Sequence, residues 1–169
     1  MSSAATCKVV TLADYMAENG GGALTLGEPV NFSGNKWTLF TFTPGEDTSY
    51  QFTGECNGYS YLRVYDEATS YFYEFNTNNS SSEYIFDSSY SMSAGKTYLI
   101  AARGGGSETA GSFSVMTREA FLAANAQPLT LGTPVTVTGN GTFYFYYTPE
   151  STGGFVFTGT SEDNAYFGL

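Results

Sequence analysis

LTLGEPVNFSGNKWTLFTFTPGEDTSYQFTG, residues Leu24 to Gly54, returns in altered form as LTLGTPVTVTGNGTFYFYYTPESTGGFVFTG, residues Leu129 to Gly159. The two stretches align without a gap at a shift of 105 residues, from position 24 to position 129, and 14 of the 31 aligned positions are identical. A repeated period fixes an architecture more firmly than local propensity does. The identical positions include the turn residues Gly27/Gly132, Pro29/Pro134, Gly34/Gly139, Pro44/Pro149 and Gly54/Gly159.

The match continues upstream after a gap of one residue. TLADYMAEN, Thr11 to Asn19, aligns with TREAFLAAN, Thr117 to Asn125. Apolar residues at i, i+3 and i+4 predict a short helix in each copy, and a threonine at the first position is a common N-cap. Gly20 to Gly22 are expected to end the first helix in a left-handed C-cap.

The repeat also predicts the division of the chain. ATCKVV before Thr11 aligns with GSFSVM before Thr117, so residues 1–10 are expected to be the closing strand of a preceding unit or an N-terminal strand. Residues 11–116 form a complete β-sandwich unit in this interpretation. YLRV at 61–64 aligns with YFGL at 166–169, so residues 117–169 contain the first half of a second, truncated unit.

Composition and turn spacing predict an all-β fold. Hydrophobic residues make up 41% of the chain, charged residues only 13%, and there are 20 glycines, a balance typical of strands joined by tight turns. We expect an antiparallel jelly-roll-like β-sandwich with a short helix opening each repeat unit. The predicted strands lie near 29–33, 37–43, 49–53, 60–66, 71–75, 83–87, 97–103 and 111–116, and the predicted core contains Phe40, Phe42, Phe52, Leu62, Val64, Tyr98, Ile100, Phe113 and Val115.

The order of these motifs resembles a known family. LxLGxPV, a Gly-Asn turn, a strand ending TFTPG, YQFTG, YLRVYD, and AGKTYLIAARG followed by GSFSV together are similar to the bacterial pre-peptidase C-terminal (PPC) domain. The resemblance covers most of residues 23–116 and the first half of the pattern again from 128 to 169. It implies a jelly-roll accessory module of secreted or surface proteins, which binds polysaccharide, protein substrate or calcium.

Charge and residue content exclude several functions. Sixteen acidic and six basic residues give a net charge of −10, which disfavours nucleic acid and anionic membranes as partners. No run of about 18 apolar residues is present, so we expect no membrane insertion. The chain has no histidine, which removes Ser-His and Cys-His activation and the commonest zinc ligand. We therefore expect that the protein is not an enzyme.

Three kinds of candidate site remain. Aromatic residues are in surplus at 59–75, and Trp37, Tyr71 and Tyr73 are candidates for stacking on a sugar ring or a protein partner. The favoured alternative is that these rings pack on a neighbouring unit or cover the sheet face. Asp66 and Glu67 offer oxygen ligands to calcium or are solvated turn residues. Cys7 and Cys56 form a disulfide or are independently buried thiols.

These observations favour a non-catalytic, extracellular repeat module of a bacterial surface or secreted protein, acting as a spacer, in adhesion or as an accessory binding domain. The alternatives are a carbohydrate-binding module that uses exposed Tyr and Trp and, least favoured, a part of a secreted hydrolase. No cofactor is expected, apart from calcium at the acidic pair. The expected partners are neighbouring repeat units or another copy through exposed strand edges, or else a glycan or surface protein. Residues 129–169 should pack on the first unit or be completed by another molecule.

Overall fold

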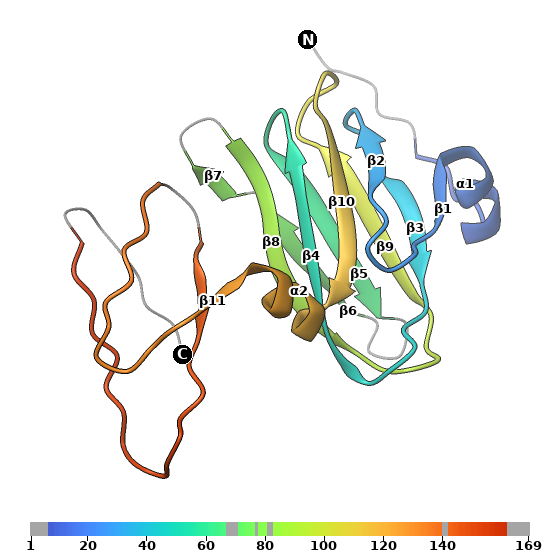
Figure 1. Cartoon of the computed structure of the whole chain (residues 1–169). Coiled ribbons are helices and arrows are strands. Elements are labelled where there is room, and N and C mark those ends of the chain that lie inside the picture. Colours follow the sequence, from blue (N-terminus) through green and yellow to red (C-terminus); the bar gives the residue numbers. More distant parts are fainter. Residues whose placement is uncertain (1–6, 67–70, 77, 81–82, 140–141, 162–169) are drawn as a thin grey trace.

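The first unit is a sandwich of two five-stranded sheets (Figure 1). The computed structural model describes residues 7–66, 71–76, 78–80, 83–139 and 142–161. One sheet has the order β1-β3-β9-β5-β6 and the other β2-β10-β4-β8-β7. The strands are β1 (Gly20–Ala23), β2 (Val30–Ser33), β3 (Thr38–Phe42), β4 (Thr48–Cys56), β5 (Ser60–Asp66), β6 (Tyr71–Asn76), β7 (Asn78–Ser80), β8 (Glu83–Met92), β9 (Tyr98–Gly104) and β10 (Ala110–Thr117).

The predicted fold class is confirmed. All strand pairs of the two sheets are antiparallel except β1 with β3, which is parallel. Each of the eight predicted strands lies on an observed one. Residues alternate between buried and half-buried along β5 and β9, as expected for strands with one face on a core.

The core between the sheets is aromatic. All nine residues predicted for it are buried, and their rings meet at steep angles. Phe40 of β3 lies edge-on to Phe113 of β10 with centroids 5.4 Å apart, and Phe42 lies edge-on to Tyr50 at 5.2 Å. Such edge-to-face pairs are favourable beyond the area that they bury, and they join strands of the two different sheets.

The glycines after the first helix end it at the predicted place, but the predicted left-handed cap conformation is wrong. Helix α1 (Leu12–Asn19) ends at Gly20, whose φ of −80° is extended, and the chain continues directly into strand β1. A Cβ at Gly21 would lie 1.9 Å from a ring carbon of Phe40. Glycine is therefore needed here because the backbone passes close to a core ring, and not for a left-handed cap.

The second segment, residues 117–161, has helix α2 (Arg118–Asn125) and strands β11 (Ala126–Pro128) and β12 (Tyr144–Tyr146). Its local structure matches the start of the first unit. Thr11 and Thr117 both cap a helix by accepting a backbone N–H three residues on. β11 pairs in parallel with β12 as β1 pairs with β3. The Leu24 N–H donates to the Thr41 carbonyl at 2.7 Å, and the equivalent Leu129 N–H donates to Tyr146 at 2.8 Å.

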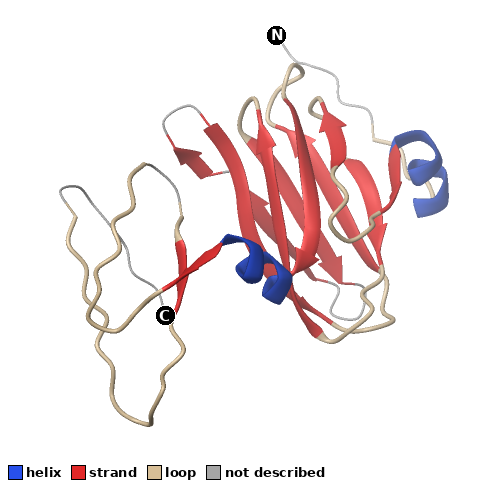
Figure 2. Ribbon diagram, viewed as in Figure 1, coloured by secondary structure: helices blue, strands red, loops and turns tan. Residues whose placement is uncertain are grey.

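The rest of the second segment is loop among the described residues (Figure 2). In the first unit β2 pairs with β10, and β4 pairs with β8 and β10. Among the described residues of the second segment, the only strand pair is that of β11 with β12, which matches the β1–β3 pair.

The residues before α1 extend over the surface. Cys7 to Val10, for which the sequence predicts a strand, are exposed and have no regular secondary structure. In Figure 1 this end and α1 lie on one side of the sandwich, and the second segment lies on the opposite side. Within the described residues, neither helix has the length or apolar character needed to span a membrane.

Candidate functional site

A polar cluster joins α2 and β12 to the first unit, and we call it the junction; it consists of Gln51, Asp87, Arg118, Phe121 and Tyr144. Gln51 of β4 is fully buried. Its side-chain oxygen accepts from Nη1 of Arg118, and its amide nitrogen donates to Asp87 Oδ1 at 2.5 Å. A buried amide without partners would be costly, so the helix that brings Arg118 supplies a partner that the sheet needs.

Tyr144 adds the contact from β12. Its hydroxyl donates to Asp87 at 2.9 Å from Oδ1 and 2.7 Å from Oδ2. Burial raises the pKa of Tyr144, and the bond to the Asp87 carboxylate and its negative charge raise it further, while Arg118 acts in the opposite direction. The phenol is therefore held in its neutral, donating form.

Apolar packing surrounds these bonds. Phe121 of α2 is buried and lies edge-on to the Tyr144 ring, with centroids 5.1 Å apart. The Arg118 guanidinium stacks over both rings, 5.1 Å from the centroid of Tyr144 and 5.7 Å from that of Phe121. The junction thus combines charge-assisted hydrogen bonds with packed rings, a combination that fixes orientation.

No sequence motif singles out the junction residues, although the repeat contains a signal for two of them. Arg118 aligns with Leu12, and Tyr144 with Leu39. Leu12 is exposed on α1, whereas Leu39 is buried. Polar side chains that appear in one copy at positions that are apolar in the other mark a contact made by that copy alone.

A second surface, the cationic aromatic face, lies on the outside of the sheet that contains β3, β5 and β9. It consists of Trp37, Tyr61, Arg63, Phe72 and Arg103. The Arg103 guanidinium lies 4.8 Å from the Trp37 ring centroid and 4.4 Å from that of Tyr61. Arg63 lies 4.5 Å from both Trp37 and Phe72.

Two of the chain's basic residues are thus held on aromatic rings. Arg63 also pairs with Glu74, with Nε 2.6 Å from Oε2. Nε of Arg103 is buried and has no hydrogen-bond partner within the described residues. Both guanidinium groups lie over the Trp37 ring, as is common for the planar, weakly hydrated cation of arginine.

The structure does not bring the three predicted aromatic residues to one face. Tyr73 pairs across the sheet with Val64, whose side chain is in the core, and its ring packs 4.9 Å from that of Tyr90. It therefore lies on the inner side, at an open margin where it keeps half its surface exposed. Trp37 is on the outer side. The backbone of Tyr71 pairs with Asp66, and its side chain lies outside the described residues.

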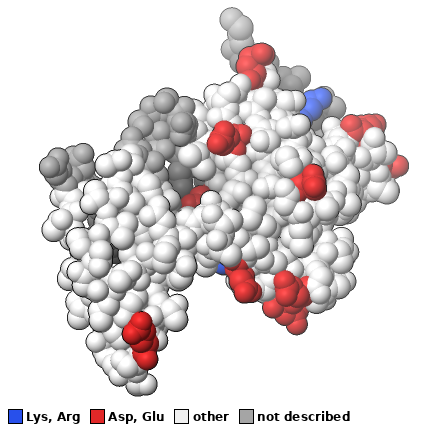
Figure 3. All heavy atoms as spheres, viewed as in Figure 1, with Lys and Arg blue, Asp and Glu red and all other residues white. Residues whose placement is uncertain are grey.

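The predicted calcium ligands are only partly described. Asp66 is nearly buried and forms an ion pair with Lys96, and Glu67 lies outside the described residues. The hydrogen bond to Asp66 raises the pKa of Lys96. No group of three acidic or cysteine side chains in the described chain could hold a metal ion, and acidic residues are scattered over the face in Figure 3. Calcium binding stays a prediction.

The two cysteines are free thiols, so the structure contains no bridge between them. Cys7 is exposed before α1, whereas Cys56 is half-buried at the end of β4. Burial raises the pKa of Cys56, and the Glu55 charge adds to this, which keeps the thiol protonated and unreactive.

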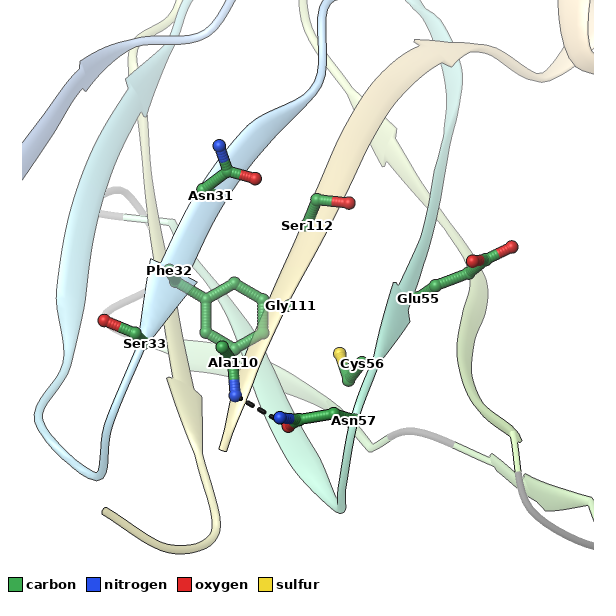
Figure 4. A pocket seen from close by; sticks show the side chains of 9 residues that line it. All are labelled: Asn31, Phe32, Ser33, Glu55, Cys56, Asn57, Ala110, Gly111 and Ser112. Atoms are coloured by element: carbon green, nitrogen blue, oxygen red, sulfur yellow. Dashed lines mark hydrogen bonds between the residues drawn. The ribbon is translucent and has the colours of Figure 1, made fainter. Parts of the chain in front are cut away.

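Cys56 lines a shallow depression across β2, β10 and β4 (Figure 4). The side chain of Asn57 accepts from the Ala110 N–H at 2.8 Å there, and Glu55 points away from the other residues in the view. A Cβ at Gly111 would lie 2.4 Å from the Cys56 sulfur, so glycine lets the strands approach. The arrangement holds the ends of the three strands together.

Comparison with known proteins gives a likeness among solved structures. No protein-family model and no curated protein matches the chain. Among solved structures, the 1.0 Å crystal structure of the pre-peptidase C-terminal domain of collagenase from Bacillus anthracis is similar, with 13% identity and a TM-score of 0.41. The alignment covers 57% of this chain and 92% of that one. The fold of this chain is established by its own strands and sheets, and membership of that family stays a prediction.

Proposed function

We propose that this chain is a non-catalytic repeat module of a secreted or cell-surface protein, in which a helix docks each unit on the one before it. Such an array is a spacer that displays attached domains at a defined distance. The proposal draws on the repeated sequence and on the local backbone shared by α1–β1–β3 and α2–β11–β12. The junction is the observation that carries it.

The junction determines whether such an array is stiff or flexible. A plain linker between units would let them rotate freely. Here the buried Gln51 amide donates to the Asp87 carboxylate and accepts from the Arg118 guanidinium. A hydrogen bond to a charged group contributes about 1.5–3 kcal/mol. Releasing α2 would leave Gln51 with an unpartnered oxygen. Successive units joined in this way have a fixed relative orientation.

Arg118→Leu tests this because it installs the residue found at the equivalent position of α1, Leu12, and keeps the helix propensity. We expect faster amide hydrogen exchange across α2 and β12 and a broader distribution of dimensions in small-angle X-ray scattering. Glu119→Gln is the matched control, since Glu119 is exposed on the same helix. A variant R118L as compact and protected as the wild type contradicts the proposal.

Location requires its own test. An antibody against residues 11–116 should label intact cells that produce the parent protein, or the protein should be found in their medium. Labelling that needs permeabilised cells contradicts an extracellular module. The low fraction of charged residues and the abundance of Ser, Thr and Asn support the extracellular assignment.

The cationic aromatic face supports a second function, carbohydrate binding. Trp37 is the only tryptophan, so quenching of its fluorescence reports directly on a ligand at this face. A panel of plant, animal and microbial glycans should include at least one that quenches it saturably. Arg103→Leu should remove the effect, whereas Tyr73→Ala, on the other side of the sheet, should not. Silence across the panel contradicts this function.

A further inference from the structure

We propose that the cationic aromatic face binds acidic polysaccharide, and that Arg103 is the residue that pairs with the carboxylate of a uronic-acid sugar. The inference rests on the second function proposed above, carbohydrate binding, and it names the class of ligand. A site of this kind separates a charged polymer from a neutral polymer with the same backbone.

Rings and guanidinium groups alternate along this face. In order they are Phe72, Arg63, Trp37, Arg103 and Tyr61, and each guanidinium carbon lies between 4.4 and 4.8 Å from the centroids of the two rings beside it. The central ring, that of Trp37, contacts both guanidinium groups and so holds them in place. A guanidinium that is stacked on a ring still has N–H donors in its own plane. The face therefore presents fixed donors to a ligand.

The two arginines differ in their charge balance. Arg63 pairs with Glu74, with Nε 2.6 Å from Oε2. Arg103 forms no ion pair with a carboxylate in the described part of the chain, and its Nε is a buried donor without a partner there. A desolvated donor that lacks a partner is unfavourable, and more so when the group is charged. A carboxylate beside the Arg103 guanidinium would supply the countercharge that Glu74 supplies to Arg63.

A small residue leaves room beside Arg103. Ala101 is two positions before Arg103 on β9 and lies opposite Arg63 of β5, so the side chain between the two arginines on this face is a methyl group. Tyr61 lies opposite Arg103. The ring of Tyr59 is edge-on to that of Tyr61 at 5.1 Å and is 41% exposed. An exposed tyrosine offers a sugar both apolar contact area and a hydroxyl group.

The strands of this face are closed to an added peptide strand. β9 pairs with β3 and β5, and β5 pairs with β9 and β6. Because their backbone groups are already paired, a peptide cannot bind here by extending the sheet. The ligand is recognised by side chains alone. Rings beside a guanidinium suit a charged sugar, whose ring packs on the aromatic groups while its carboxylate pairs with arginine.

The positive charge of the face is local, because the chain as a whole has a net charge of −10. Of its six basic residues, Arg63 and Arg103 belong to the face, and Lys36 directly precedes Trp37. Repulsion by distant carboxylates is screened over about 8 Å at physiological ionic strength. Binding of an acidic sugar thus depends on short-range pairing, and removing the charge of the ligand is the direct way to measure that pairing.

Matched ligands test the preference on the wild-type chain. Oligomers of polygalacturonate, alginate and hyaluronan are titrated while the fluorescence of Trp37 is followed, and each is compared with its own methyl ester. The ester keeps the sugar backbone and removes the charge. We expect at least one acidic oligomer to bind, and its ester to bind at least about tenfold more weakly, which corresponds to the loss of one hydrogen bond to a charged group.

The contrary outcomes separate this proposal from carbohydrate binding in general. Equal binding of acid and ester, or quenching by neutral glycans alone, overturns the acidic ligand and leaves carbohydrate binding in place. Silence with all acidic oligomers overturns the proposal as well. Polyglutamate is the remaining arm, and binding as tight as that of the acidic oligomers would assign the face to acidic peptides instead.

Arg103→Leu tests the residue. We expect the acidic oligomer to bind at least about tenfold more weakly, whereas binding of its methyl ester should change by less than about twofold. Lys8→Gln is the matched control, because it removes the same charge from an exposed position outside the face. Isothermal titration calorimetry is used, since the substitution alters the surroundings of Trp37. An R103L variant that binds the acid as tightly as the wild type, or a K8Q variant that loses as much, overturns the role of Arg103.

Discussion

The first unit and the second segment have similar sequences and unequal structures. Phe40 is buried in the first, and its identical counterpart Phe145 is exposed in the second. The short helix, its cap and the parallel strand pair appear in both, since their contacts are close in sequence. Among the described residues, antiparallel ladders occur only in the first unit. Similar strand sequences thus form ladders in one region and loops in the other, because a strand also needs a partner for its backbone groups.

The largest expected effect is a difference in the free energy of unfolding between alanine substitutions of Phe52 and Phe157, which occupy aligned positions in the two regions. Phe52→Ala should reduce the free energy of unfolding by about 3–5 kcal/mol, because it opens a cavity in the core. Phe157→Ala should change it by less than about 0.5 kcal/mol, as is usual for exposed positions. Urea unfolding of both variants, followed by circular dichroism, measures the difference.

An equal effect of the two substitutions would contradict this prediction. Equal losses for F52A and F157A would mean that the second segment buries Phe157 in solution. Because that would also occur if copies associate, the measurement is made at low concentration and repeated at a tenfold higher one.

The next largest effect is expected for Gly54 and Gly159, which follow Phe52-Thr53 and Phe157-Thr158 in the two copies. Gly54→Ala should destabilise the first unit by about 3 kcal/mol, since the added methyl would meet the backbone of β10. Gly159→Ala should leave the unfolding of the dilute protein unchanged. Thermal unfolding by calorimetry tests both. A tolerated Ala at position 54 would show that β4 and β10 separate at little cost.

The sequence was sufficient for the fold because its signals are local or periodic. Alternation of residues such as Leu62 and Val64 predicts the buried parity, and comparison of the copies identifies Phe40 and Phe42 as core. The glycines after α1 were misinterpreted because a close approach to Phe40 depends on tertiary structure that no local pattern contains.

The candidate sites were less predictable for a similar reason. Trp37 and Tyr73 are both aromatic residues in or beside strands, but Tyr73 lies on the inner side because the register of β5 with β6 places it opposite Val64. The junction brings together residues from four elements separated by up to 93 positions, from Gln51 to Tyr144. No spacing rule connects such residues, although the replacement of Leu12 and Leu39 by Arg118 and Tyr144 marks two of them.

A smaller effect is expected at alkaline pH, where docking of α2 and β12 at the junction should weaken. Loss of the hydrogen bond from Tyr144 to the Asp87 carboxylate should cost about 1.5 kcal/mol of docking free energy. The pKa of Tyr144 is raised above its ordinary value of 10.0 when α2 is docked. The docked form therefore binds the phenolic proton more tightly, and docking is complete below pH 10 and weakens as pH rises through the raised pKa.

Hydrogen exchange of α2 against pH measures this change. Tyr144→Phe is the control, because it has no proton to lose and should show constant, weaker protection over the same range. Lys96, whose pKa is also raised, titrates in both proteins and so cancels from the difference. Identical pH profiles for wild type and Y144F would show that the Tyr144 hydroxyl does not hold the segment in place.

The smallest effect is expected for the two N-cap threonines, Thr11 and Thr117. Their substitution distinguishes a loss of helix stability from a loss of docking at the junction. Thr11 and Thr117 accept the Asp14 and Ala120 N–H groups at 3.1 and 3.2 Å, so replacing either by Ala should cost its helix about 1 kcal/mol. For Thr11→Ala the loss should stay within α1. For Thr117→Ala it should also appear as faster exchange at β12, because α2 carries Arg118 and Phe121 into the junction. Two variants with purely local effects would mean that β12 is held by Tyr144 alone, and the helix would then be a tether without a part in setting the orientation of the segment.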